Sequence, residues 1–221
     1  MRKGLYILIA LVLILGLASG CDSPVSVFSR FNATADSIRF KEEYEALNSV
    51  LNEDGTNAHH VMSINRVSNV KYLDYGELMD FIDDKTGLLY FGRPACPWCR
   101  QLIPHMLEFA KEDRVDVYYY DIEHDRAENN DEYKSILAFF GEFLPTDTVT
   151  QDEDDPDFDE SLKRVVLPHL FFLKDGKVVA DLEFFQHESL RDGDSEKVKQ
   201  LLRCSYAYID SRIVIDDDCE C

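Results

Sequence analysis

Two cysteines separated by two residues, Cys96 and Cys99, are the residues of this chain best suited to chemistry. They follow the apolar run Gly87–Phe91, which predicts a buried strand, and they open a predicted helix over Pro97–Glu112. A pair with this spacing and position is typical of thiol–disulfide exchange. The free N–H groups and the helix dipole stabilise a thiolate at a helix N-terminus. We therefore expect Cys96 to be the nucleophile and Cys99, one turn into the helix, to resolve a mixed disulfide.

The residues around the pair have chemical roles of their own. Pro97 suits the first helical turn, because an N–H group there has no partner within the helix and proline lacks this group. Arg93 and Arg100 flank the pair and add positive potential to an acidic chain, so we expect both to favour the thiolate. Trp98, the only tryptophan, lies between the cysteines. Its ring either contacts client proteins or packs on a neighbouring loop.

These residues carry a resemblance to a known family. The segment Leu88–Pro104 resembles the active-site strand and helix of the thioredoxin superfamily, and Val166–Val179 resembles its cis-proline strand and the hairpin that follows. The resemblance implies that Pro168 is a cis-proline facing the cysteines, and that the backbone before it, at Leu167, binds an extended client segment. The Gly-Arg-Pro-x-Cys-Pro-x-Cys context is similar to that of thioredoxin-like bacterial lipoproteins and bacteriocin transport accessory proteins.

The chain departs from the family pattern near the cysteines and downstream of them. The family's buried acid, six residues before the first cysteine, is here Tyr90, and the aromatic residue two positions later is Gly92. The segment that leads to Pro168 is longer than in thioredoxin. We expect these departures to affect the direction of electron flow more than the fold. His169, next to Pro168, either tunes the Cys96 thiolate or is a surface histidine.

Strands and helices are expected to alternate around the cysteines. This order favours a parallel sheet with helices on its faces. With the resemblance, which covers about residues 67–210, it predicts an α/β protein with a thioredoxin fold, in which helices flank a central mixed sheet. The expected elements are strand Val67–Leu73, helix Tyr75–Asp83, strand Gly87–Phe91, helix Pro97–Glu112, strand Val115–Tyr120, helix Asp131–Phe143, strands Val165–Leu173 and Lys177–Phe185, and a helix from about Ser195.

Two segments are additions to this domain. Phe40, Tyr44 and their successors recur at helical spacing, which predicts a helix over residues 38–52 on the outside of the domain. Residues 145–164 are expected to be an exposed acidic loop, since seven of the ten residues of Gln151–Glu160 are acidic. That run lacks the residue order of a calcium-binding EF loop, and we expect no metal site.

The N-terminus predicts export. Met1–Lys3 is basic, and the apolar run Leu5–Leu17 is too short for a spanning helix. Leu17–Cys21 resembles the bacterial lipoprotein signal, which implies that residues 1–20 are cleaved and that Cys21 is lipidated; an ordinary signal peptide is the alternative. We therefore expect residues 21–66 to form a lipidated tether and a helix, and Cys21 to hold the protein in the bilayer on the extracytoplasmic face of the cell membrane.

The acidic composition disfavours another class of function. The formal net charge is −20, from 43 acidic and 23 basic residues. Such a surface repels phosphate backbones and anionic lipid alike. We expect no nucleic-acid partner.

Three cysteines remain: Cys204, Cys219 and Cys221. Outside the cytoplasm thiols tend to pair. Either Cys204 bonds one of the other two and staples the tail, residues 211–221, or Cys219 and Cys221 close on each other and relay electrons. A metal site made of these thiols lacks an evident fourth ligand.

The sequence thus predicts a membrane-anchored thiol–disulfide oxidoreductase that acts on exported proteins. The disulfide of Cys96 and Cys99 is its redox centre, with no further cofactor. Its partners are exported cysteine-containing proteins and an electron donor or acceptor of the cell envelope. The alternative is a non-catalytic thioredoxin-fold accessory module for secretion or assembly of a peptide such as a bacteriocin. Whether the protein oxidises, reduces or isomerises disulfides stays open.

Overall fold

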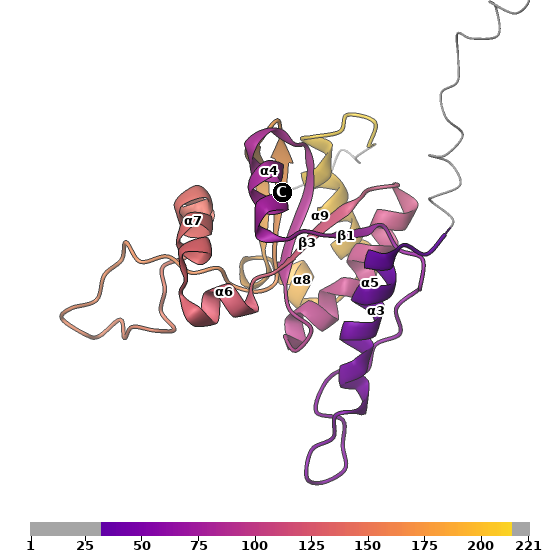
Figure 1. Cartoon of the computed structure of the whole chain (residues 1–221), viewed down its shortest axis with the longest axis horizontal. Coiled ribbons are helices and arrows are strands. Elements are labelled where there is room, and N and C mark those ends of the chain that lie inside the picture. Colours follow the sequence, from indigo (N-terminus) through magenta and orange to yellow (C-terminus); the bar gives the residue numbers. More distant parts are fainter. Residues whose placement is uncertain (1–31, 214–221) are drawn as a thin grey trace, which may run out of the picture.

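A computed structural model describes residues 32–213 of the chain. Within this range a five-stranded mixed sheet has the strand order β1-β3-β2-β4-β5. Strands β1, β3 and β2 run parallel to one another. Strand β4 pairs antiparallel with β2, and β5 pairs antiparallel with β4. The predicted α/β class, with helices flanking a central mixed sheet, is confirmed (Figure 1). The strands are β1 (Val70–Tyr72), β2 (Gly87–Gly92), β3 (Val117–Asp121), β4 (His169–Lys174) and β5 (Lys177–Glu183).

One face of the sheet is covered by the helices α3 (Ala35–Ala46), α5 (Pro97–Glu112) and α9 (Ser195–Ala207). Phe40 of α3 meets Tyr119 of β3 edge to face, with ring centroids 5.1 Å apart. Tyr206 of α9 contacts Phe109 of α5 and Phe172 of β4. Since alternate residues of a strand point to opposite faces, Leu88 and Tyr90 of β2 belong to this layer.

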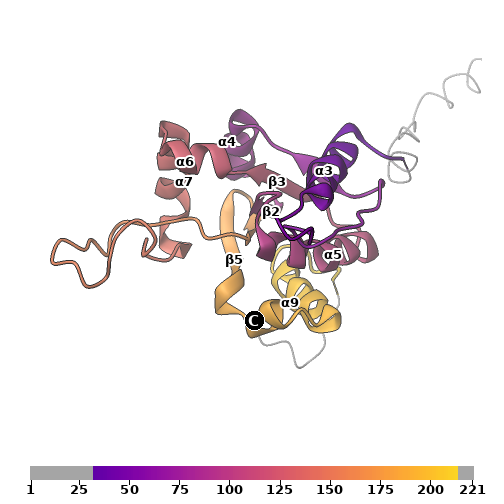
Figure 2. The same ribbon diagram turned by 90° about the horizontal axis from the view of Figure 1, so that it is seen from below.

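The helices α4 (Tyr75–Asp84) and α7 (Asp131–Phe140) cover the opposite face. Phe81 of α4 packs on Tyr118 of β3, with ring centroids 4.4 Å apart. Phe140 of α7 packs on Phe91 of β2 and on Phe171 of β4. The sheet therefore separates two aromatic layers, and the cysteine-bearing helix α5 belongs to the layer that also holds α3 (Figure 2).

Side-chain caps set where the helices begin. Thr34 accepts a hydrogen bond from the Ser37 N–H at 3.0 Å, and Asp74 accepts one from the Glu77 N–H at 2.8 Å. In both cases the later side chain bonds back to the backbone of the cap, which completes a capping box. Helix α3 therefore starts earlier than residue 38, where the apolar spacing placed it.

Some predicted boundaries are wrong. The helix expected over residues 38–52 ends at Ala46 and continues as a 3-10 turn, η2 (Leu47–Ser49), so Leu51 is exposed instead of buried. The chain turns there, because the Asn52 N–H donates to the Thr56 carbonyl at 2.8 Å. The helix expected over 131–143 likewise ends at Phe140, followed by a second 3-10 turn, η3 (Gly141–Phe143).

Other short elements were not predicted. They are the helices α6 (Glu123–Glu128) and α8 (Glu188–Asp192) and the 3-10 turn η4 (Phe184–Gln186). Each has fewer than two full turns, too few for an apolar period to be visible in the sequence.

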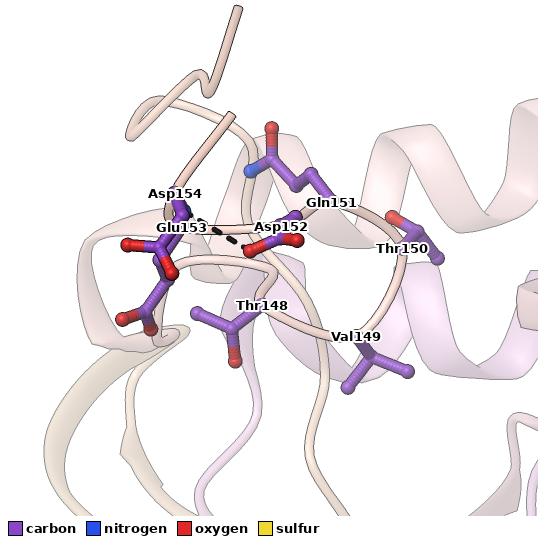
Figure 3. A pocket seen from close by; sticks show the side chains of 7 residues that line it. All are labelled: Thr148, Val149, Thr150, Gln151, Asp152, Glu153 and Asp154. Carbon is purple, nitrogen blue, oxygen red and sulfur yellow. Dashed lines mark hydrogen bonds between the residues drawn. The ribbon is translucent and has the colours of Figure 1, made fainter. Parts of the chain in front are cut away.

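The acidic loop extends away from the sheet, on the side opposite to α3 (Figures 1 and 2). Its base is closed by a bridge between Thr146 and Lys163 and by a hydrogen bond from the Asp147 N–H to the Leu162 carbonyl at 2.8 Å. Further out, the loop curves around a hollow lined by residues 148–154 (Figure 3). No group of metal-ligating side chains comes together there or elsewhere in residues 32–213.

Several predictions fall on residues outside the described range. These are the signal peptide, residues 1–20, the lipidated Cys21 and the tail cysteines Cys219 and Cys221. Cys204 in α9 is disulfide-bonded, and its pairing with a tail cysteine stays a prediction. No helix in residues 32–213 is both long enough and apolar enough to span a membrane.

Candidate active site

The two cysteines lie where the buried strand β2 passes into α5. Cys96 is the N-cap of α5, and its Sγ accepts a hydrogen bond from the Cys99 N–H at 3.2 Å. Pro97 occupies the first turn, as expected. Both thiols are free, and the exposed fraction of the residue is 4% for Cys96 and 0% for Cys99. Cys96 therefore lies at the rim of the domain, and Cys99 lies directly beneath it.

The surroundings of Cys96 favour its thiolate. Its pKa is lowered to about 7, first by a hydrogen bond from the Cys99 thiol and then by the backbone N–H groups of Cys99 and Trp98, while burial opposes them. The positive charge of Arg93 also lowers this pKa. Arg93 is itself held by Glu123, with its Nη1 2.5 Å from the Glu123 Oε2. The effect of Arg93 therefore has the predicted direction, and it is smaller than that of the hydrogen bonds to the sulfur.

The segment that precedes β4 runs past the Cys96 sulfur. The Cys96 Sγ lies 3.6 Å from the carbonyl oxygen of Leu167. The peptide bond between Leu167 and Pro168 is cis, as the resemblance implied. Residues 71 positions apart in the chain thus meet at one sulfur atom. A backbone carbonyl at this place can align an extended peptide beside the thiol.

Cys99 has the opposite electrostatic character. Burial raises its pKa well above the ordinary value of a thiol, and the adjacent Cys96 raises it further. A hydrogen bond from the Tyr90 hydroxyl and one from the backbone of Arg93 oppose that shift. At neutral pH Cys96 is thus partly ionised while Cys99 holds its proton, the division of labour expected of a nucleophile and a resolving thiol.

Arg100 has a different role from the one predicted. Its side chain is fully buried, and its guanidinium donates to the carbonyls of Tyr44 and His60 and to the Asn48 Oδ1, at 2.8 Å in each case. A further bond goes to the carbonyl of Pro94 at 3.1 Å. The guanidinium is directed to the N-terminal helix and the segment after it, so Arg100 joins α3 to α5 instead of flanking the Cys96 thiolate.

The ring of Trp98 combines the two roles between which the sequence could not decide. It is 40% exposed, and it also packs on Phe184 of η4, with ring centroids 5.3 Å apart. An aromatic surface beside the Cys96 thiol is therefore available to a client and held in place by a neighbouring element.

The expectation of a surface histidine at position 169 is wrong, and its effect on the Cys96 thiolate stays a prediction. The side chain is fully buried, its Nε2 lies 2.9 Å from the Asp181 Oδ2, and the ring stacks on Phe171. The side chain of His169 lies on the face of the sheet that α7 covers, whereas the side chain of Tyr90 points to the opposite face. The alternation of side chains along β4, which starts at this residue, directs it there.

Two tyrosines belong to this site without having been predicted. Tyr90, on β2, affects the pKa of the Cys99 thiol, and the hydroxyl of Tyr44, from α3, lies 3.4 Å from that of Tyr90. The helical spacing identified Tyr44 as a buried residue, but it could not indicate which strand residue the ring would meet. The position of Tyr90 six residues before Cys96 was the available signal.

Neither a protein-family model nor a curated protein sequence matches the chain.

Proposed function

We propose that this protein is a thiol–disulfide oxidoreductase in which Cys96 exchanges with a client sulfur and Cys99 resolves the product. The observation that carries the proposal is the pairing of a partly ionised thiol at the N-cap of α5 with a protonated thiol buried behind it. The strand order, the cis peptide bond before Pro168 and its proximity to Cys96 are compatible with a thioredoxin-like fold. They support placing the chain in that superfamily.

The exchange proceeds in two steps. The Cys96 thiolate attacks one sulfur of a client disulfide, which forms a Cys96–client disulfide and releases the other client sulfur as a thiolate. Cys99 then loses its proton and attacks the Cys96 Sγ, which forms the Cys96–Cys99 disulfide and releases the second client sulfur. Both client thiolates take up protons. The client gains two electrons and the cysteine pair loses two; the reverse sequence oxidises a client dithiol.

Three neighbouring groups support binding of an extended client. The Leu167 carbonyl lies beside the Cys96 Sγ, the Trp98 ring presents an exposed aromatic surface, and Pro168 fixes the backbone between them and β4. Client cysteines would approach from this rim, because Cys99 is closed off by the protein itself.

The proposal extends to the location of the protein. Lipidation of Cys21 would tether the domain to the extracytoplasmic face of the cell membrane, where exported cysteine-containing proteins are its clients and an envelope component exchanges electrons with it. Labelling cells with a fatty-acid probe tests this. Label on the wild type and none on Cys21→Ala supports the anchor; label on both, or on neither, contradicts it.

Trapping tests the activity. We expect Cys99→Ser to accumulate a disulfide-linked adduct at Cys96 when it is mixed with a disulfide-containing peptide, whereas the wild type releases the reduced peptide. Cys96→Ser should do neither, which provides the matched control. Absence of both adduct and peptide reduction would contradict the proposal and favour the non-catalytic accessory module.

The reduction potential of the cysteine pair would then assign the direction of electron flow. A value of about −270 mV is typical of a reductant and one of about −120 mV of an oxidant. Equilibration of the pair with glutathione buffers, followed by mass spectrometry of the alkylated protein, gives this value.

A further inference from the structure

A chain of three polar groups runs from the N-terminal helix to the resolving thiol. The hydroxyls of Tyr44 and Tyr90 lie 3.4 Å apart, and both side chains are fully buried. The Tyr90 hydroxyl in turn lowers the pKa of the buried Cys99 thiol, which places the two groups next to each other in the interior. The three residues come from α3, β2 and α5, so the arrangement exists only when α3 is docked.

Space for the Tyr90 hydroxyl is provided by Gly92. The two residues lie on the same face of β2, and a Cβ atom at position 92 would overlap the hydroxyl and ring of Tyr90. Close approach, and not backbone conformation, is therefore the reason for a glycine here. The two departures from the thioredoxin pattern in this strand depend on each other, since a side chain at 92 would displace the tyrosine.

Packing and hydrogen bonds hold the Tyr44 hydroxyl beside Tyr90. The ring of Tyr44 contacts Phe40, with centroids 4.6 Å apart, and Tyr90 packs on Tyr119 with centroids 5.3 Å apart. The backbone of Tyr44 is joined to α5 by Arg100, whose Nη1 donates to its carbonyl at 2.8 Å. Arg100 directly follows Cys99, so α3 is fixed to the same turn of helix that carries the resolving thiol.

From this arrangement we infer that Tyr90 donates a hydrogen bond to the Cys99 thiolate during the resolving step, and that Tyr44 positions Tyr90 for it. This inference rests on the proposed function. It assigns α3 a part in the chemistry in addition to its part in the core. A pair of neutral donors thereby stands where the thioredoxin pattern has a buried acid.

The acid–base properties of the tyrosines suit this role. Burial raises the pKa of both Tyr44 and Tyr90 well above the ordinary value, so each keeps its proton through the physiological range. The groups that act on Cys99 from the elements around it are Cys96 on α5, these two hydroxyls and the backbone of Arg93. The described side chains include no carboxylate among the main influences on Cys99, and the pH dependence of resolution should follow Cys99 itself.

The chromogenic disulfide dithiobisnitrobenzoate separates the two steps. Attack by Cys96 releases one nitrothiobenzoate and leaves the other on Cys96; attack by the Cys99 thiolate, whose proton passes to the buffer, releases the second and forms the Cys96–Cys99 disulfide. The mature chain with Cys21→Ser is the protein used. A variant that also carries Cys96→Ser and Cys99→Ser measures release by the remaining thiols, which is subtracted.

We expect Tyr90→Phe to slow the second release about tenfold at pH 7 and to leave the first within about twofold, since a hydrogen bond to a charged group is lost only in the second step. The pH of half-maximal resolution should rise by about one unit. Tyr44→Phe should slow the second release about threefold and should also raise the pH of half-maximal resolution. Tyr120→Phe, which removes a buried hydroxyl bonded to Asp125 on the opposite face, is the matched control and should change neither step.

The outcomes distinguish this inference from the proposed function. If the wild type releases the second group and Tyr90→Phe does so at the same rate, the inference is wrong and the oxidoreductase stands. Equal slowing of both steps would also overturn it, because Tyr90 would then act through packing. If the wild type releases only the first group, the proposed function itself fails.

Discussion

The N-terminal helix and the acidic loop are both additions to the sheet and its covering helices, yet they differ in what they bury. Phe40 and Tyr44 of α3 are fully buried, and the segment after α3 adds the buried Met62 and Ile64. In the loop, Val149 is 72% exposed. The loop is held by its own bonds, such as that from the Asp154 N–H to the Asp152 Oδ1 at 3.0 Å (Figure 3).

The difference shows which addition can influence the cysteines. Because α3 contributes side chains to the layer that contains Cys99, a change in α3 reaches the thiol through direct contacts. A change in the loop, whose contacts are local and solvated, should end at its base. We therefore expect larger effects from variants that break a buried contact of α3 than from one that removes most of the loop.

The largest effect is expected from Phe40→Ala. It deletes a ring packed against Tyr44, Tyr72 and Tyr119 and should lower the free energy of unfolding by about 3–5 kcal/mol. Val149→Ala in the loop should change it by less than about 0.5 kcal/mol. Urea denaturation of both variants measures the difference, and similar losses would remove the distinction between the two regions.

Next is Arg100→Met, which keeps an unbranched apolar stem and removes the guanidinium. Carbonyl oxygens of Tyr44 and His60 then lose a buried donor, and we expect the free energy of unfolding to fall by about 3 kcal/mol. Arg164→Met at the base of the loop breaks a pair with Asp147 at 3.4 Å and should cost about 1 kcal/mol or less. A cost for Arg100→Met as small as that for Arg164→Met would show that Arg100 does not join α3 to α5.

The two thiols extend the comparison to reactivity. Alkylation requires the thiolate, and lowering the pH protonates it. The pKa of Cys96 is about 7, so its alkylation rate should level off above that pH and fall about tenfold per unit below it. Burial raises the pKa of Cys99, so that thiol should stay unreactive at neutral pH. Iodoacetamide labelling followed by peptide mapping tests this; equal labelling of both thiols at pH 7 would contradict it.

The smallest effect on activity is expected from shortening the loop. Replacing residues 148–161 with Asn-Gly joins Asp147 to Leu162, which are already hydrogen-bonded at 2.8 Å. Loop-closure entropy depends weakly on length, by about 0.6 kcal/mol per doubling, so the free energy of unfolding should rise by no more than about 2 kcal/mol. The rate of exchange with a disulfide peptide should stay the same. A severalfold loss of that rate would assign the loop a role in client binding.

Much of this arrangement could be predicted from local patterns. The alternation of apolar runs and helical periods identified the strands and helices of the sheet layers, and the Cys-x-x-Cys spacing identified the thiols. Element ends were less predictable, as at Leu51, because caps and turns depend on single hydrogen bonds. The partners of Arg100 and His169 could not be predicted, since both are set by elements distant in the chain.

The sequence by itself determined the class of fold and the identity of the two thiols, because periodicity and helix-terminus electrostatics act over a few residues. Tertiary structure alone decided which distant groups surround the two thiols. Packing brings Tyr44, 46 positions from Tyr90 along the chain, into contact with it, and the Leu167 carbonyl to the Cys96 sulfur. These contacts depend on burial in a shared interior, which a linear pattern does not record.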